Sequence, residues 1–155
     1  MIKKIIPLLI LFISISHCGF TPLYSKKTNI DFSITSIEFE GDRTINNFLK
    51  TNLSQYQKND SDRKFDIIVI TDYGKTILSK DKAANTTNYQ LSSTTTFKIN
   101  SNNKTIKEFK ILEKEIMDNI SDDFQEQKNE KTYKQNFASS ISNKLLTELS
   151  LLNDN

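Results

Sequence analysis

Apolar and polar side chains alternate over residues 86–100, and this period of two narrows the possible folds more than any other feature. One side of such a strand carries the apolar members Tyr89, Leu91, Phe97 and Ile99. The pattern predicts a long strand with one face against a core and the other against water or a polar partner. Ser101-Asn102-Asn103 predicts a tight turn, because asparagine tolerates positive φ, so residues 105–117 are expected to return as a second strand.

Two further strands and a helix are expected before this hairpin. Residues 31–40 predict a strand whose apolar parity changes near Thr35-Ser36, which indicates a β-bulge. Asp42 is a suitable N-cap for a helix ending near Gln57, with apolar residues at helical spacing. Residues 65–73 predict a strand that is central or covered on both faces, since Ile67 to Ile70 are apolar in succession. Gly74 is expected to break or bulge that strand before residues 76–79, and a polar loop follows.

The last fifth of the chain has a helical period. Residues 122–152 carry one apolar stripe, formed by Tyr133, Phe137, Ile141, Leu145, Leu149 and Leu152. Residues 125–131 contain no apolar side chain, so the sequence leaves their helical state open. The expected order is β-α-β-β-β-α. This order predicts an α+β two-layer sandwich, in which a four-stranded mixed sheet carries two helices packed on one face.

The amino terminus has the features of an export signal. Lys3 and Lys4 precede an apolar stretch from Ile5 to Ile15, which is too short to span a hydrocarbon core of about 30 Å. Ile15-Ser16-His17-Cys18 then looks like a lipobox. We therefore expect residues 1–17 to be a signal peptide, Cys18 to be acylated, and residues 18–29 to tether one domain over 30–155. An ordinary signal peptide or an uncleaved anchor is the alternative.

The tether carries three large apolar side chains. Phe20, Leu23 and Tyr24 follow Cys18 closely and are candidates for a membrane or partner contact, since aromatic groups collect at membrane interfaces. The sequence does not separate these two roles.

The residue types left in the mature chain exclude most catalytic chemistry. Without residues 1–17 the chain keeps 19 basic and 19 acidic residues, no histidine and one cysteine. Histidine-based nucleophiles, zinc centres and phosphate-binding glycine loops are thereby excluded, and the balanced charge argues against nucleic acid. We expect no catalytic residue, no metal and no cofactor. A carboxylate-based envelope hydrolase is the enzymatic alternative.

The segment Cys-Gly-Phe-x-Pro-Leu-Tyr at Cys18 to Tyr24 resembles the mature start of LptE, the lipopolysaccharide-assembly lipoprotein family, in its alphaproteobacterial form. Phe48 to Leu53 is similar to a segment of the family's first helix. The two long central strands and a terminal helix ending in leucines follow the family's order. The resemblance covers essentially the whole mature chain.

The resemblance implies a non-enzymatic lipoprotein at the periplasmic face of the outer membrane, held there by palmitate-type acyl chains. Its implied partners are the LptD β-barrel, which it would plug and help to assemble, and lipopolysaccharide, which the pair inserts into the outer leaflet. Gly19 suits outer-membrane sorting. A periplasmic lipoprotein subunit of a lipid-transporting ABC system remains the alternative.

Three lysines form the candidate lipopolysaccharide site. Lys75, Lys80 and Lys82 cluster around the turn expected between the two long strands, and Asp81 is the only acid among them. Phosphates attract such cations, and loops at the end of a sheet often carry binding residues. A solvated loop is the alternative interpretation.

Overall fold

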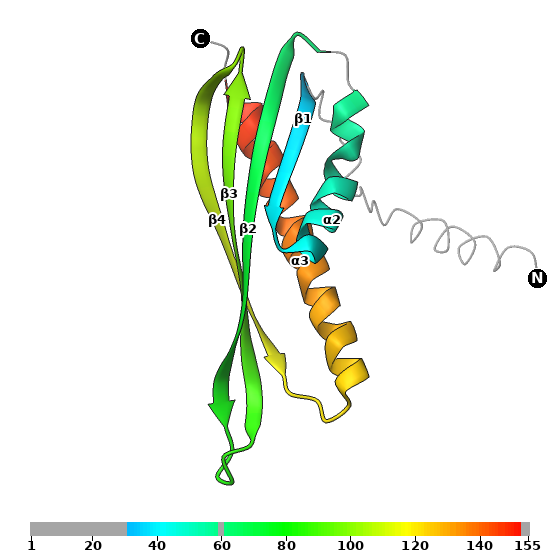
Figure 1. Ribbon diagram of the computed structural model, residues 1–155, viewed down its shortest axis with the longest axis vertical. Helices are drawn as coiled ribbons and strands as arrows, with labels where there is room; N and C mark the ends of the chain where they lie inside the picture. Colours follow the sequence, from blue (N-terminus) through cyan, green and yellow to red (C-terminus); the bar gives the residue numbers. More distant parts are fainter. Residues whose placement is uncertain (1–30, 59–60, 153–155) are drawn as a thin grey trace, which may run out of the picture.

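A computed structural model describes residues 31–58 and 61–152, so the predicted signal peptide and the tether with Cys18 lie outside the described residues. The chain forms a tall, four-stranded sheet with two helices on one side (Figure 1). In order, the elements are β1 (Phe32–Gly41), α2 (Arg43–Leu53), the 3-10 helix η2 (Ser54–Lys58), β2 (Arg63–Lys80), β3 (Thr86–Ser101), β4 (Lys104–Asp118) and α3 (Asp123–Leu151). The predicted β-α-β-β-β-α order and α+β class are confirmed.

The sheet has the strand order β1-β2-β3-β4. β1 runs parallel to β2, and the other two pairs are antiparallel, so α2 lies in the crossover that joins the two parallel strands. The predicted bulge is present, because the β1–β2 register shifts between Ile34 and Ser36. Asn102 and Asn103 both have positive φ (50° and 61°) and make the β3–β4 turn, as their side chains allow.

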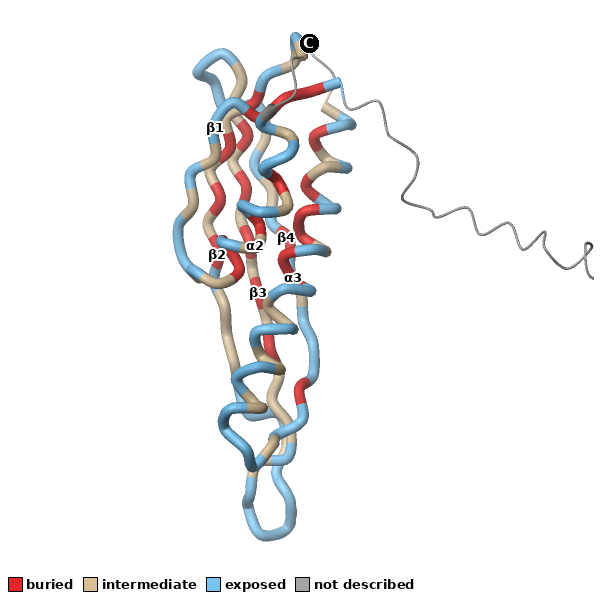
Figure 2. The backbone as a smooth tube through the Cα atoms, turned by 90° about the vertical axis from the view of Figure 1, so that its right-hand side faces the viewer, coloured by how far each residue is buried: buried red, intermediate tan, exposed pale blue. Residues whose placement is uncertain are grey.

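The core lies between the inner face of the sheet and the two helices, in the upper part of the molecule (Figure 2). β3 places alternate residues there, as its pattern predicts, and α3 contributes Phe137, Ala138, Ile141, Leu145 and Leu149. Polar side chains interrupt the core partway down, above Leu91 and Met117. Thr71, Ser93 and Thr95 are buried side by side in the sheet, and the hydroxyls of Thr71 and Thr95 are 3.4 Å apart.

Two details of β2 differ from expectation. Gly74 does not break the strand but pairs with Ser92, because its backbone is extended and needs no positive φ. The register shifts only later, on either side of Ser79. The strand is central, as one of the two predicted alternatives has it, but its apolar run is buried on one face alone, since Ile68 and Ile70 alternate with the buried Ile67 and Val69 and are half-exposed.

α3 is helical from Asp123, so the apolar-free stretch 125–131 belongs to it. The Asp122 carboxylate accepts from the backbone N–H groups of Phe124 and Gln125, which caps the first turn. With 29 residues at 1.5 Å each, α3 is about 44 Å long. Its first half lies beside the lower part of the sheet (Figure 1).

Candidate functional site

The lower end of the molecule exposes apolar and cationic side chains together. It consists of the β2–β3 turn, the end of β4 and the start of α3 (Figure 1). We call this region the distal end. Large apolar side chains are exposed on these elements, namely Ile77, Leu78, Ile116 and Phe124. Apolar groups left in water beside cations are typical of surfaces that meet a partner or an amphiphile.

The turn itself presents two of the three predicted lysines. The Asp81 carboxylate accepts from the backbone N–H groups of Ala83 (2.8 Å) and Asn85 (2.9 Å) and from the Asn85 amide (3.1 Å). These bonds, with those from Asn85 the strongest, lower the pKa of Asp81. Lys80 and Lys82 are exposed on either side, and no hydrogen bond or ion pair within 31–58 and 61–152 involves their ammonium groups.

Lys75, the third predicted lysine, has a different environment. Its Nζ lies 2.6 Å from a Glu126 carboxylate oxygen and 3.0 Å from one of Glu130, and its side chain is only 24% exposed. It also lies 4.4 Å from the centre of the Tyr89 ring. Burial alone would lower the pKa of Lys75, but the two carboxylates outweigh it and raise that pKa. The three lysines therefore do not form one equivalent group.

A second lysine completes this arrangement. Lys134 Nζ lies 2.8 Å from Asp42 Oδ2 and 3.8 Å from Glu130 Oε1, and 3.8 Å from the centre of the Tyr73 ring. We call the five ionised residues of these contacts the helix–sheet clamp, which consists of Lys75, Lys134, Asp42, Glu126 and Glu130. The clamp joins α3 to β2 and to the start of α2, because Asp42 also caps α2 through Ile45 N.

The clamp was not predicted from the sequence. Glu126, Glu130 and Lys134 recur at intervals of four, which places them on one helix face. Nothing in that spacing shows that the face turns toward β2.

Burial and the nearby Glu130 and Asp42 charges raise the pKa of Tyr73, so its hydroxyl stays protonated well above the usual range.

The outer face of the sheet has no covering layer among the described residues. The register places Leu112 beside Thr94 and Ile116 beside Gln90, on the side away from the helices. The outward positions of β3 are polar and half-buried, and they are Asn88, Gln90, Ser92, Thr94, Thr96 and Lys98. This mixed face suits a hydrated contact surface better than a lipid interior.

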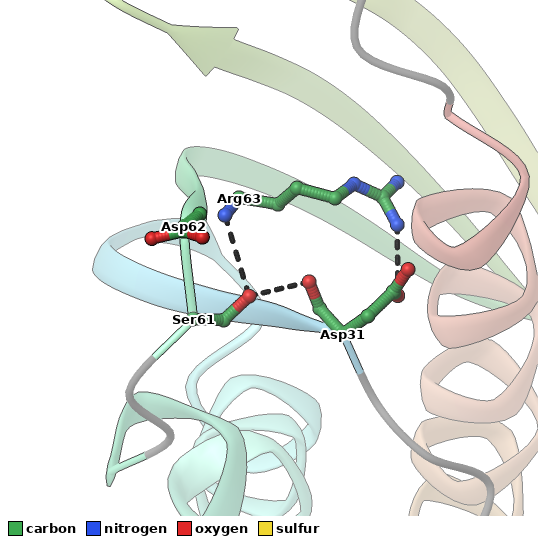
Figure 3. Close-up of a pocket in the computed structure, with 4 residues that line it drawn as sticks. All are labelled: Asp31, Ser61, Asp62 and Arg63. Atoms are coloured by element: carbon green, nitrogen blue, oxygen red, sulfur yellow. Dashed lines mark hydrogen bonds and ion pairs between the residues drawn. The ribbon is translucent and has the colours of Figure 1, made fainter.

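A hollow of about 520 Å³ at the upper end is lined by Asp31, Ser61, Asp62 and Arg63 (Figure 3). The Arg63 guanidinium is 2.8 Å from Asp31 Oδ1, and it also donates to the carbonyl oxygens of Leu149 (3.2 Å) and Leu152. Those carbonyls belong to the last turn of α3, where cations are favourable. Arg63 thus fastens the end of α3 to the start of β1, which is a structural role.

Neither a metal site nor a membrane-spanning helix is found in the part of the chain that the structure describes. No group of three or more His, Cys, Asp or Glu side chains there could hold a metal ion. None of its helices is long and apolar enough to cross a membrane. Cys18, Phe20, Leu23 and Tyr24 lie outside the described residues.

The fold is shared with bacterial lipoproteins. No protein-family model and no curated protein matches the sequence. Among solved structures, the chain is similar to rare lipoprotein B from Shewanella oneidensis, with 14% identity and a TM-score of 0.54 over 75% of this chain and 98% of that one. A minor lipoprotein from Acinetobacter baumannii gives 13% identity and a TM-score of 0.53, covering 74% and 92%. Lipoprotein B from Nitrosomonas europaea gives 12% and 0.52, covering 79% and 89%.

Proposed function

We propose that this protein is an LptE-type lipoprotein of the outer membrane, anchored through Cys18 at the periplasmic face. There it plugs the LptD β-barrel, assists barrel assembly and takes part in inserting lipopolysaccharide into the outer leaflet. The observation that carries the proposal is the likeness of fold to lipoprotein B, which extends over nearly the whole length of the related chain.

Two features of the chain support this role. The Cys-Gly-Phe-x-Pro-Leu-Tyr segment at Cys18 to Tyr24 is similar to the family's mature start and supplies an acylation site. The outer sheet face mixes hydroxyl, amide and a few apolar groups, which fits the hydrated lumen of a barrel. Lys80 and Lys82 are the proposed contacts for lipopolysaccharide phosphates, with Lys75 behind them, and Phe20, Leu23 and Tyr24 are proposed to contact the membrane or the barrel.

Affinity purification from detergent-solubilised envelopes tests the plug. A carboxy-terminal tag on the full chain should co-purify one large β-barrel protein, identified by mass spectrometry. Recovery of an inner-membrane ABC complex would instead assign the chain to lipid import. Recovery of neither would contradict the plug.

The anchor is tested by Cys18→Ala, with His17→Ala as the matched control that keeps the acylated cysteine. Each buried CH₂ of an acyl chain contributes about 0.8 kcal/mol, and several chains hold a protein permanently. Cys18→Ala should therefore leave an uncleaved or soluble form, whereas His17→Ala should fractionate with the outer membrane. Outer-membrane recovery of Cys18→Ala in cells lacking the barrel would contradict a lipid anchor.

A further inference from the structure

The lower part of β2 has an open edge. β1 pairs with β2 only as far as Gly41 and Thr71, and the last bond on this side runs from Asp42 N to Thr71 O at 2.8 Å. Gly41, with φ of 91°, then turns the chain away into α2 (Figure 1). β2 continues to Lys80, paired with β3 on its other side alone.

The direction of the backbone groups on this edge follows from the Thr71 bond. A strand residue points its own N–H and C=O to the same side, and successive residues alternate. Because Thr71 O points toward β1, Tyr73, Lys75 and Ile77 present their N–H and C=O groups to the open edge. No hydrogen bond between described residues uses these groups, whereas Gly74 and Thr76 face β3.

The other two edges of the sheet differ from the open part of β2. β1 is contacted by α2 and η2. β4 carries a charged residue at eight of its fifteen positions, which is how natural sheets discourage a further strand. The open part of β2 lacks this protection. Between Tyr73 and Ser79 its one charge is Lys75, which Glu126 and Glu130 already neutralise, and Ile77 and Leu78 are 54% and 47% exposed.

No segment within 31–58 and 61–152 occupies this edge. Residues 19–30, between Cys18 and the described domain, reach about 40 Å when fully extended. Running back along β1 would use about 33 Å of that reach before the open segment begins. The edge is therefore available to a partner molecule.

We propose that the edge at Tyr73, Lys75 and Ile77 is a docking site for an extended polypeptide segment of a partner protein, which adds to the sheet as a strand. Three residues provide about six backbone hydrogen bonds, since each offers one donor and one acceptor. The register shifts around Ser79 end the site below. Alternate side chains of the incoming segment would meet the outer sheet face, close to Leu78. This inference goes beyond the plug and does not require the partner to be a β-barrel.

Photo-crosslinking in intact cells is the first part of the test. Benzoylphenylalanine in place of Leu78 should capture one partner polypeptide, and peptide mapping should place the link in an extended segment. The matched control replaces Leu112 on β4, which is 53% exposed on the outer face at a charged edge. We expect at least about tenfold less of the link to that extended segment from this control, even where the outer face meets the same partner elsewhere.

Amide hydrogen exchange is the second part, measured on the full lipoprotein in the captured complex and alone. The amides of Tyr73, Lys75 and Ile77 should exchange quickly alone and at least about tenfold more slowly in the complex. Those of Gly74 and Thr76 should be slow in both states. Ile77→Pro, which removes one open-edge donor, should lower capture at Leu78, whereas Ile77→Val should not.

The outcomes separate this inference from the proposed function. Capture of a β-barrel with the alternating protection supports both. Capture of another polypeptide with that protection supports strand docking and contradicts the plug. Capture without alternating protection, a crosslinked dimer of this chain alone, or no capture would overturn strand docking.

Discussion

At the scale of single residues, Gly41 is where the polypeptide leaves the sheet. Its φ of 91° is accessible to glycine, and an added Cβ would lie 1.9 Å from Thr71 O and 2.8 Å from Thr71 C. Both atoms belong to the backbone of the central strand and cannot rotate away. One glycine therefore fixes where β1 ends, where α2 begins and where the edge of β2 becomes open.

Gly41→Ala should lower the free energy of unfolding by about 2–4 kcal/mol, because it combines unfavourable φ with a backbone clash. Gly74→Ala is the matched control. Its added Cβ would meet only the rotatable Ser92 Oγ, at 3.1 Å, so we expect a change within about 1 kcal/mol. Urea unfolding of both variants measures the difference. Equal stability of the two would contradict the role given to Gly41.

Tyr73 makes the fold sensitive to alkali. Burial and the charges of Glu130 and Asp42 raise the pKa of its hydroxyl above the ordinary value near 10. Below pH 10 the group is protonated in both the folded and the unfolded chain. Above it the unfolded chain loses the proton first, so the free energy of unfolding should fall as pH rises. Tyr73→Phe should flatten this fall in thermal scans between pH 9 and 11, and an unchanged slope would contradict the assignment.

At the scale of elements, α3 is held by different forces along its length. Its second half is packed through a buried apolar stripe, whereas its first half contacts the sheet through the helix–sheet clamp. At its end Arg63 binds the last carbonyl groups. The helix is thus anchored at both ends by polar contacts and in between by the core.

Lys134→Gln should detach the first half of α3 locally. Its ammonium is mostly buried with Asp42, and removing it leaves Asp42 and Glu130 without their shared cation. We expect a loss of roughly 1–3 kcal/mol, between the effects of exposed and fully buried pairs. Faster amide exchange over residues 123–134 should accompany it. Lys128→Gln, at an exposed position of the same helix, should change neither measurement.

The sequence predicted the elements well where the pattern was local. The alternation in β3, the bulge near Ser36, the asparagine turn and the α3 stripe were all confirmed. The break at Gly74 was wrong, because pairing with β3 decides whether a glycine interrupts a strand. The clamp was missed for a similar reason. Lys75 lies 51 positions from Glu126 along the chain, and only the packed fold brings them within 2.6 Å.

At the scale of the whole molecule, the β2–β3 hairpin extends below the start of α3 (Figure 1). One end holds the packed domain, and the distal end carries the free cations and exposed apolar groups. The polar belt at Thr71, Ser93 and Thr95 and the clamp lie between them. Such a division allows the distal end to contact a ligand without exposing the core.

Because the distal end and the clamp are separate, the proposed lipopolysaccharide site can be tested apart from stability. Lys80→Gln combined with Lys82→Gln should weaken binding of purified lipopolysaccharide by about three- to tenfold at low salt, and less at high salt, where the native contacts are already screened. The melting temperature should stay the same, because the ammonium group of neither lysine has a partner among the described residues.

Lys75→Gln should behave in the opposite way. It leaves Glu126 without its cation and Glu130 with only the more distant Lys134, so stability should fall while binding changes little. Titration with lipopolysaccharide at two salt concentrations measures the affinity of both variants, and thermal unfolding measures their stability. Equal affinity of the double variant and the wild type at low salt would remove the turn as a phosphate site, and loss of binding in Lys75→Gln alone would move that site into the clamp.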